Sequence, residues 1–249
     1  MTETICDLSE RVALVTGAGQ NVGAGIAHAL ARQGAQVLVN DIVQERADEV
    51  VHQIKLSGGT ARAVLFDVAN LDSVLTALAP IGPIDILVNN AGNAGSERMQ
   101  PRPFVEMDPE AWESPIRVNL YGVLHCCHAV VPGMCARGRG RVVTISSGAA
   151  TAGVNIGVAP YSAGKGGAIA FTRSLALEVA PAGVTANSLA IGLMEIPDPQ
   201  LTERLARSIP VGRTGTPEDV AAACVWLASD EAAWVTGQTI QINGGSITT

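Results

Sequence analysis

The stretch Val12-Ala13-Leu14-Val15-Thr16-Gly17-Ala18-Gly19-Gln20-Asn21-Val22-Gly23 decides the fold. Its first four residues form an apolar run of strand length, and a helical pattern follows over residues 22–33. A glycine-rich turn between a strand and a helix lets backbone N–H groups approach a pyrophosphate, and the helix N-terminus adds a favourable dipole. The residues expected at such a phosphate site are Gly17, Gly19, Asn21, Val22 and Gly23.

The alternation of short apolar runs with longer helical patterns continues along the chain. Further strands are predicted at 36–40, 63–66, 84–88, 141–145, 184–189 and 238–242. Further helices are predicted at 44–57, 71–78, 109–135, 161–179 and 217–228. This order indicates an α/β fold, a doubly wound, seven-stranded, mostly parallel sheet with helices on both faces. The 249 residues suit one domain, 1–249, because a chain of this length can build one large core.

The composition excludes several classes of protein. The formal net charge is −7, and no Lys/Arg-rich run occurs, so nucleic-acid binding is not expected. Gly, Pro, Asn or a charge interrupts every long apolar stretch, which argues against a membrane span. Residues 1–10 have neither the basic nor the apolar region of a signal peptide.

The cysteines and histidines indicate neither disulfides nor a metal site. Five cysteines without a C-x-x-C pair indicate reduced thiols and a cytoplasmic protein. His125 and His128 lie three residues apart in a predicted helix. Without a nearby carboxylate or thiolate at ligand spacing they make a poor metal site, so no metal is expected.

Asp41 ends the second predicted strand, 24 residues after Gly17. A dinucleotide-binding fold places near this position the acid that binds the adenosine ribose hydroxyls. A carboxylate there would repel a 2′-phosphate, so we predict NAD rather than NADP. The alternative is that Asp41 only caps the following helix. Arg46, one turn into that helix, counts against the preference for NAD.

Tyr161 and Lys165 lie four residues apart and therefore share one face of a predicted helix. A free phenol has a pKa of about 10, and a nearby ammonium group lowers it. Such a tyrosine can exchange a proton with an alcohol or carbonyl oxygen near neutral pH. Ser147 precedes the pair by a short loop, so these residues form a candidate catalytic group.

From about residue 11 to residue 245 the chain resembles the short-chain dehydrogenase/reductase family. The glycine turn resembles the family's T-G-x-x-x-G-x-G, Asp67-Val68 its adenine-contacting pair, and Asn89-Asn90-Ala91-Gly92 its ribose-side motif. Further matches are Gly212-Arg213, Pro217-Glu218-Asp219, Thr236-Gly237-Gln238 and Gly244-Gly245. The resemblance implies a Rossmann-like domain with Asn119, Ser147, Tyr161 and Lys165 as catalytic residues. It assigns cofactor contacts to Asp67, Val68, Asn90, Tyr161, Lys165 and the backbone near Met194.

Two departures from the family pattern bear on cofactor binding. Asn21 replaces the middle glycine of the turn, and an alternative register, Gly19-x-x-x-Gly23-x-Gly25, fits the glycine pattern literally. Asn tolerates positive φ better than most residues, so the first register can survive. The threonine that normally holds the nicotinamide carboxamide is Ile196 here, which leaves backbone groups near Leu193 and Met194 as substitutes.

The resemblance implies an NAD-dependent oxidoreductase that interconverts a secondary alcohol and a ketone by hydride transfer. Tyr161 would exchange the proton, Lys165 would lower its pKa and hold the ribose, Ser147 would orient the substrate oxygen, and Asn119 would anchor a water. We expect a small-molecule substrate, held between loops 93–103, 148–160 and 193–210, and a homotetramer paired through the long helix and the Tyr161 helix. A catabolic secondary-alcohol or 3-hydroxyacyl dehydrogenase is favoured. A 3-oxoacyl thioester reductase and a non-catalytic dinucleotide sensor are the alternatives.

Overall fold

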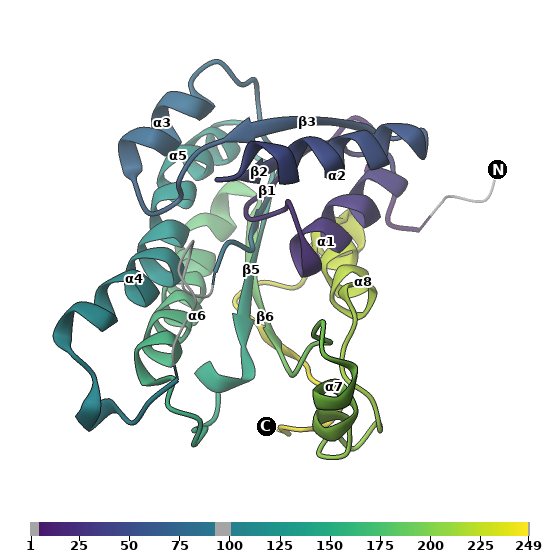
Figure 1. The fold of residues 1–249 in the computed structure, drawn as a ribbon. Helices are drawn as coiled ribbons and strands as arrows, with labels where there is room; N and C mark the ends of the chain where they lie inside the picture. The colour runs from purple at the N-terminus through teal and green to yellow at the C-terminus, as the bar shows by residue number, and fades with distance from the viewer. Residues whose placement is uncertain (1–4, 93–100, 249) are drawn as a thin grey trace.

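The computed structural model describes residues 5–92 and 101–248. Seven strands form one sheet in the order β3-β2-β1-β4-β5-β6-β7, and every pairing between them is parallel (Figure 1). The strands are β1 (Val12–Val15), β2 (Gln36–Asp41), β3 (Thr60–Leu65), β4 (Ile86–Asn89), β5 (Gly140–Ser147), β6 (Val184–Ile191) and β7 (Thr239–Ile242). The predicted fold class is confirmed.

Helices cover both faces of the sheet (Figure 1). They are α1 (Asn21–Arg32), α2 (Gln44–Leu56), α3 (Leu71–Leu78), α4 (Glu113–Ile116), α5 (Gly122–Ala136), α6 (Ala159–Val179), α7 (Pro199–Ala206) and α8 (Pro217–Ala228). Short 3₁₀ turns occur at Phe104–Glu106, Pro109–Trp112, Gly148–Ala150, Ala180–Ala182 and Asp230–Ala232. One face packs against α1, α2 and α8, and the opposite face packs against α3, α5 and α6.

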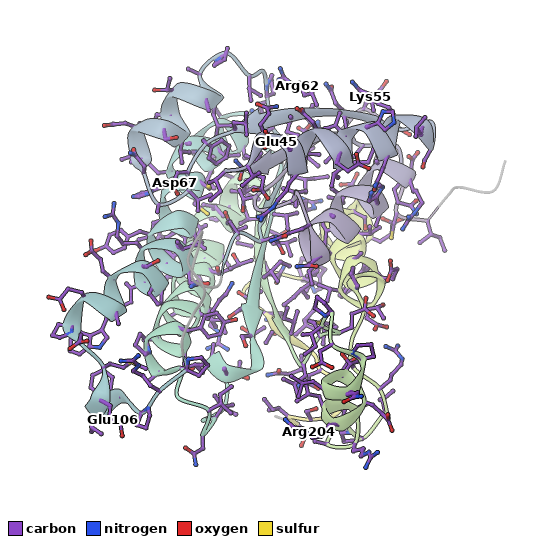
Figure 2. All side chains as sticks on the ribbon, viewed as in Figure 1. Glu45, Lys55, Arg62, Asp67, Glu106 and Arg204 are labelled. Carbon is purple, nitrogen blue, oxygen red and sulfur yellow. The ribbon has the colours of Figure 1, made fainter. Side chains whose placement is uncertain are left out.

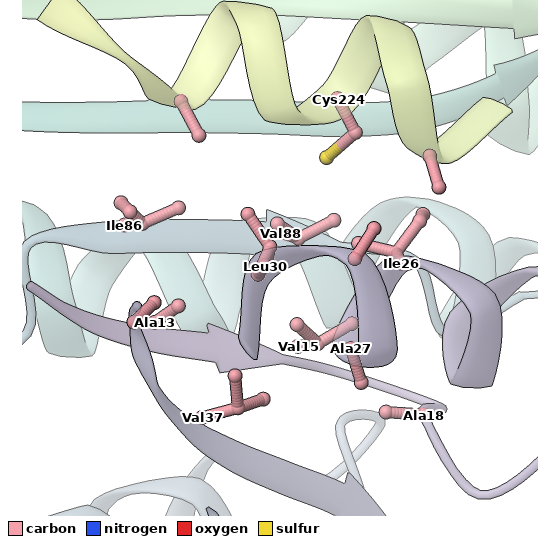
Figure 3. Packing of buried hydrophobic residues seen from close by; sticks show 14 of the residues in the cluster. Ala13, Val15, Ala18, Ile26, Ala27, Leu30, Val37, Ile86, Val88 and Cys224 are labelled. Atoms are coloured by element: carbon pink, nitrogen blue, oxygen red, sulfur yellow. The ribbon is translucent and has the colours of Figure 1, made fainter. Parts of the chain in front are cut away.

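The strand residues divide between these two cores because successive side chains point to opposite faces of a sheet. Ala13 and Val15 of β1 belong to the core under α1 and α8, whereas Leu14 belongs to the other core. Figure 3 shows Ala13 and Val15 beneath α1, with Cys224 of α8 pointing into the same cluster. Both faces of the strands are therefore buried, as expected for a parallel sheet.

Most charged side chains lie at the periphery, whereas Asp41, Asp85, Arg141 and Lys165 are buried. The charged side chains labelled in Figure 2 are all exposed: Glu45, Lys55, Arg62, Asp67, Glu106 and Arg204. One helical stretch among the described residues, Pro109–Ala136, is long and apolar enough to cross a membrane by length and composition. Half of its most apolar window is buried inside the fold, as in the core helix of a globular protein.

The helix predicted at 109–135 is not continuous in the structure. It is not broken at Pro132, because α5 continues through this proline to Ala136. The irregular turn instead spans Arg117–Tyr121, which is a π-helical turn between α4 and α5. Asn119 lies in it, and its Nδ2 donates to the Pro115 carbonyl at 2.8 Å. A wider turn of this kind is frequent at functional sites.

Helix α7 was not predicted, since residues 193–210 were expected to form a loop. Asp198 caps this helix, because its Oδ1 accepts from the N–H groups of Gln200 and Leu201 at 3.0 and 3.1 Å. Pro199 then occupies the first turn, where its missing N–H costs nothing. The Asp198-Pro199 pair was the local signal for this helix.

Helix α8 begins with a capping box, and its acidic residue also binds an arginine. Asp219 accepts from the Thr216 N–H at 2.8 Å and from both terminal nitrogens of Arg213 at 2.6 and 2.7 Å. Hydrogen bonds from Arg213 and Thr216 hold the pKa of Asp219 well below its ordinary value. The loop after α7 is thereby tied to α8.

We predict that Asp219→Asn lowers the free energy of unfolding by about 1 kcal/mol at pH 7. Because the folded-state pKa of Asp219 is depressed, its stabilisation is complete above the unfolded pKa of about 3.9 and is lost as the pH falls through the folded pKa. Urea unfolding at pH 7 and pH 2.5 measures this. A difference between variant and wild type that does not shrink at the lower pH would contradict the assignment.

Candidate active site

The glycine turn after β1 adopts the register that begins at Gly17. Gly17 has a φ of +59° and Asn21 a φ of +49°, both in the left-handed region. A Cβ at Gly23 would collide with the Gly17 carbonyl oxygen and lie 2.5 Å from Asn90 Nδ2. Gly25, which the alternative register would use, instead lies against Pro217 of α8. The sharp turn therefore tolerates Asn21 because asparagine adopts positive φ more easily than most residues.

Asn90 and Thr16 tie this turn to the end of β4. Asn90 Nδ2 donates to the carbonyl oxygens of Thr16 and Gly17 at 2.9 and 3.0 Å. The Thr16 hydroxyl accepts from the N–H groups of Asn90 and Ala91, each at 3.0 Å. The order of the sheet reverses between β1 and β4, and ligands of open α/β sheets bind at this switch point.

Asp41 lies beside the glycine turn and is almost fully buried. Its Oδ2 accepts from the Gly19 N–H at 3.1 Å, and its Oδ1 accepts from the Val43 N–H at 3.0 Å. The carboxylate thus bonds to Val43, the residue before α2, and to the glycine turn, but it caps none of the first N–H groups of α2. Arg46 is exposed, and its Cβ lies within 2.6 Å of a Cβ placed at Gly19.

Asp67 and Val68 follow β3 at the neighbouring part of the crevice. Asp67 is exposed, and its Oδ1 accepts from the Ala69 N–H at 2.8 Å. Val68 is buried against Gly122, and its carbonyl oxygen lies 2.8 Å from His125 Nδ1. Among residues 5–92 and 101–248, no group of three or more His, Cys, Asp or Glu side chains is placed to hold a metal.

Lys165 and Asn119 meet beside Gly92. Lys165 is 5% exposed, and its Nζ donates to the Ile145 carbonyl oxygen at 2.7 Å. A Cβ placed at Gly92 would lie 2.7 Å from Lys165 Nζ and 2.9 Å from Asn119 Oδ1. Asn119 is fully buried. The structure therefore brings together an ammonium group and an amide that lie on different helices.

Ser147 and Tyr161 form the other half of the candidate catalytic group. Ser147 ends β5, and its Oγ accepts from the Ala149 N–H at 3.2 Å. Its hydroxyl is also hydrogen-bonded to the Tyr161 side chain. Tyr161 lies in the first turn of α6 and is half-buried.

Burial governs the acidity of both ionisable groups. It lowers the pKa of Lys165 to about 8, because a desolvated ammonium group is unfavourable. Burial also raises the pKa of the Tyr161 phenol above its ordinary value, and the hydrogen bond with Ser147 opposes this shift. From the sequence we expected Lys165 to lower the tyrosine pKa. The structure differs, because desolvation of the phenol outweighs the hydrogen bond with Ser147, and Lys165 is not among the causes of the shift.

Met194 lies where the chain leaves β6 and is partly buried against the core. It pairs with Gly215 in an isolated bridge. The Leu193 carbonyl accepts from the Gly215 N–H, and the Glu195 N–H donates to the Gly215 carbonyl, each at 2.9 Å. The Leu193 carbonyl and the Glu195 N–H are therefore already hydrogen-bonded within the chain. The Ile196 side chain has no polar atom. Its backbone N–H donates to the Thr202 hydroxyl, and its carbonyl accepts from the same hydroxyl.

The predicted substrate loops are described in part. Arg98 and residues 93–100 of the first loop lie outside the described residues. The Arg102 N–H donates to the Gly157 carbonyl at 3.1 Å, which joins the end of that loop to the second. Sequence reasoning placed Gly92 in the ribose-side motif without foreseeing its contact with Lys165 and Asn119, and it gave no role to Ile145. Ile145 contributes only a backbone carbonyl, for which no side-chain pattern gives a signal.

A protein-family model described as enoyl-(acyl carrier protein) reductase matches residues 17–246. The chain belongs to the short-chain dehydrogenase/reductase family. It is 38% identical to the short-chain reductase protein NovJ of Streptomyces niveus, with 98% of this chain and 97% of that protein covered. It is 39% identical to an acetoacetyl-CoA reductase of Shinella zoogloeoides, with 94% and 98% covered. The chain is therefore an oxidoreductase of this family.

Solved structures of short-chain dehydrogenases/reductases superpose closely on this fold. A 3-oxoacyl-[acyl-carrier protein] reductase from Brucella melitensis, solved with bound NAD, has a TM-score of 0.92 and 31% identity, covering 98% of this chain and 94% of its own. A gluconate 5-dehydrogenase from Burkholderia cenocepacia J2315, solved with NADP and tartrate, has a TM-score of 0.88 and 34% identity, covering 97% and 96%. These neighbours therefore include both a protein solved with NAD and one solved with NADP.

We predict that Gly23→Ala weakens binding of the nicotinamide dinucleotide at least tenfold, because the new methyl group pushes apart the Gly17 carbonyl and Asn90. Fluorescence titration with NADH and with NADPH measures the affinity, and a thermal melt checks the fold. Gly82→Ala is the matched control, since no atom lies within 4 Å of a Cβ at that position. Equal affinities for the two variants would show that this turn does not hold the dinucleotide.

Proposed function

We propose that this short-chain dehydrogenase/reductase interconverts a secondary alcohol and a ketone with NAD as its cofactor. The observation that carries the proposal is the convergence of four groups at the carboxyl end of β5. Ser147 is hydrogen-bonded to Tyr161, and Lys165 Nζ and Asn119 Oδ1 both lie beside Gly92. A dinucleotide sensor on the same fold, the alternative from another class, would have no use for this proton-transfer group.

In the reduction direction, Tyr161 donates its phenolic proton to the substrate oxygen, and in oxidation the phenolate removes the alcohol proton. A phenol whose pKa is raised by burial is mostly protonated near pH 7, which suits the donor role. Ser147 holds the substrate oxygen by a second hydrogen bond. The dinucleotide, when bound, supplies or accepts the hydride.

Lys165 and Asn119 support the proton transfer. The Lys165 ammonium group stabilises the tyrosinate left after donation, because the attraction between opposite charges is stronger in a poorly solvated site than in water. Its pKa of about 8 means that this positive charge is lost as the pH rises above that value. Asn119 is the expected anchor of a water that connects Lys165 with solvent, which agrees with its buried Oδ1 beside the lysine.

The walls around this site favour a substrate with an apolar chain. Val154 and Ile156 of the second loop and Leu193 and Ile196 of the third loop are all more than one-third exposed. Acetoacetyl-CoA and 3-oxoacyl groups, named for two of the similar proteins, fit such a rim better than a polyhydroxy acid does. We therefore favour a catabolic secondary-alcohol or 3-hydroxyacyl dehydrogenase, with a 3-oxoacyl thioester reductase as the second candidate.

Tyr161→Phe is predicted to lower kcat at least a hundredfold, since general acid–base catalysis by one side chain contributes factors of 10² to 10⁴. Absorbance of NADH at about 340 nm, a wavelength set by the cofactor, follows turnover of acetoacetyl-CoA and of a panel of secondary alcohols. Tyr121→Phe is the control, because this other tyrosine is half exposed near the start of α5. It should stay within about twofold of wild type. Near-normal turnover by the Tyr161 variant would refute the mechanism.

The preference for NAD rests on Asp41, whose buried carboxylate lies beside the Gly19 N–H. Asp41→Asn should raise the ratio of kcat/KM with NADPH to kcat/KM with NADH at least tenfold. The change removes a negative charge that would repel a 2′-phosphate, while an amide oxygen can still accept one of the two backbone hydrogen bonds. An unchanged ratio would mean that Asp41 serves only its backbone contacts at Gly19 and Val43.

The proposed assembly is a homotetramer located in the cytoplasm, with no nucleic-acid or membrane partner. Tyr121, on the turn before α5, and Leu177, on α6, are exposed, and one surface cavity is lined by Tyr121 together with Trp112 and His125. Burying these groups between subunits would remove apolar surface from water. Sedimentation velocity at micromolar concentration should give a mass of four chains, and a monomer would contradict the proposal.

A further inference from the structure

The chain closes with a tail, residues 243–247, that follows β7 and has a defined course. Asn243 Nδ2 donates to the Ile247 carbonyl at 3.0 Å and to Gln241 Oε1 at 3.2 Å. The Gly245 N–H donates back to Asn243 Oδ1 at 3.0 Å. These three bonds fold the tail back onto the end of β7. Gln241 and Ile247 therefore contact the same neighbouring segment.

That segment is the 3₁₀ turn that directly follows Ser147, and Gln241 bonds to its end. Gln241 Nε2 donates to Thr151 Oγ1 at 3.0 Å, across 90 positions of sequence. Thr151 Oγ1 in turn donates to the Gly148 carbonyl at 3.1 Å, and the Thr151 N–H donates to the same oxygen at 3.0 Å. A chain of hydrogen bonds therefore runs from the tail to the residue next to Ser147.

Ile247 makes the second contact with this turn. Its Cδ1 lies 2.9 Å from the position of a Cβ at Gly148, so it fills the space that a side chain there would take. Ile247 is half-buried, whereas its neighbours Ser246 and Thr248 are exposed. Gly148 itself is buried. The apolar side chain of the tail is thus packed on the backbone of the turn.

The orientation of the Ser147 hydroxyl depends on the same turn. Ser147 Oγ accepts from the Ala149 N–H at 3.2 Å. Ala149 directly follows Gly148, the residue against which Ile247 packs. It is also hydrogen-bonded to Tyr161. A shift of the Gly148–Ala150 turn would move the Ala149 N–H and change the direction in which the serine presents its hydroxyl.

We propose that Gln241 of β7 and Ile247 of the tail together form a positioning element that holds the Ser147 turn in its catalytic geometry. The inference rests on the proposed function, because Ser147 orients substrate only if the chain is a working dehydrogenase/reductase. Gln241, Thr151 and Ile247 are positioning residues, since they act through the turn and touch none of the reacting groups.

The test compares variants that break the bond between Gln241 and Thr151 from either side. Gln241→Leu and Thr151→Val should each lower kcat about tenfold, with the KM for the dinucleotide unchanged, because misplacing a catalytic group costs rate. The double variant should lose less kcat than the product of the two single losses, since both single variants remove the bond between Gln241 and Thr151. Thr151→Ser keeps the hydroxyl and should retain kcat within about twofold.

Gln238→Leu is the matched control. Gln238 lies at the start of β7, its side chain bonds only to the nearby Thr236 carbonyl, and its backbone bonds survive the change. Hydrogen exchange of the amides in 148–152 is the second readout. It should accelerate in Gln241→Leu and Thr151→Val and stay at the wild-type rate in Gln238→Leu.

Ser147→Ala, measured beside these variants, separates the two proposals. If it keeps wild-type turnover, the proposed function fails. If it loses turnover while Gln241→Leu matches Gln238→Leu in kcat, the positioning role of the element is overturned, whatever the exchange rates. An equal loss of kcat in Thr151→Ser and Thr151→Val would likewise overturn it, because packing rather than the hydrogen bond would then matter.

Discussion

The hydrogen bonds between Thr16 and Asn90 are the constraint on which the rest of the site depends. They join the ends of β1 and β4, two strands that are distant in the chain and adjacent at the reversal of the sheet order. Each such bond contributes about 1 kcal/mol to stability. Because Thr16 is buried, loss of its partner would leave an unsatisfied polar group, which costs more than the bond itself contributes. Because Asn90 sits under the turn, the turn can approach so closely that position 23 has no room for a side chain. Two residues later, Gly92 leaves the space in which Lys165 and Asn119 meet.

Lys165 has the least favourable environment of these residues. Its ammonium group is buried and donates to the Ile145 carbonyl, and burial lowers its pKa to about 8 from an ordinary value of 10.5. Because the folded-state pKa is lower than the unfolded one, this residue costs stability below about pH 8, and the cost declines as the pH rises toward 10.5. A cation retained at such a cost, next to a half-buried phenol, is typical of a functional site.

Much of the fold could be predicted from local patterns. The alternation of apolar runs and helical patterns identified seven strands, because buried parallel strands and amphipathic helices differ in period. Helix α7 was missed, although Asp198-Pro199 signals its start, because it has only eight residues and none of them is buried. The π turn at Arg117–Tyr121 could not be predicted either, since it depends on how Asn119 is packed against α6, where a Cβ placed at Gly164 would lie 3.1 Å from the Asn119 Cβ. The raised pKa of Tyr161 could not be predicted either. Residue spacing indicates that Lys165 shares a helix face with Tyr161, but it does not show that burial desolvates the phenol.

The sequence by itself determined the class of fold, the family and the identity of the candidate catalytic residues. It also reduced the register of the glycine turn to two alternatives. These follow from residue types at short spacings, where strand and helix periods fix which side chains share a face. Only the tertiary structure decided how those residues act together. It selected the register through the positive φ of Gly17 and Asn21 and the contact of Gly25 with Pro217, and it revealed that Asp41 bonds to both the glycine turn and the residue before α2. It also brought Gln241 and Ile247 to the turn after Ser147. Contacts between distant segments depend on the packing of the whole sheet, and no local pattern of side chains carries that information.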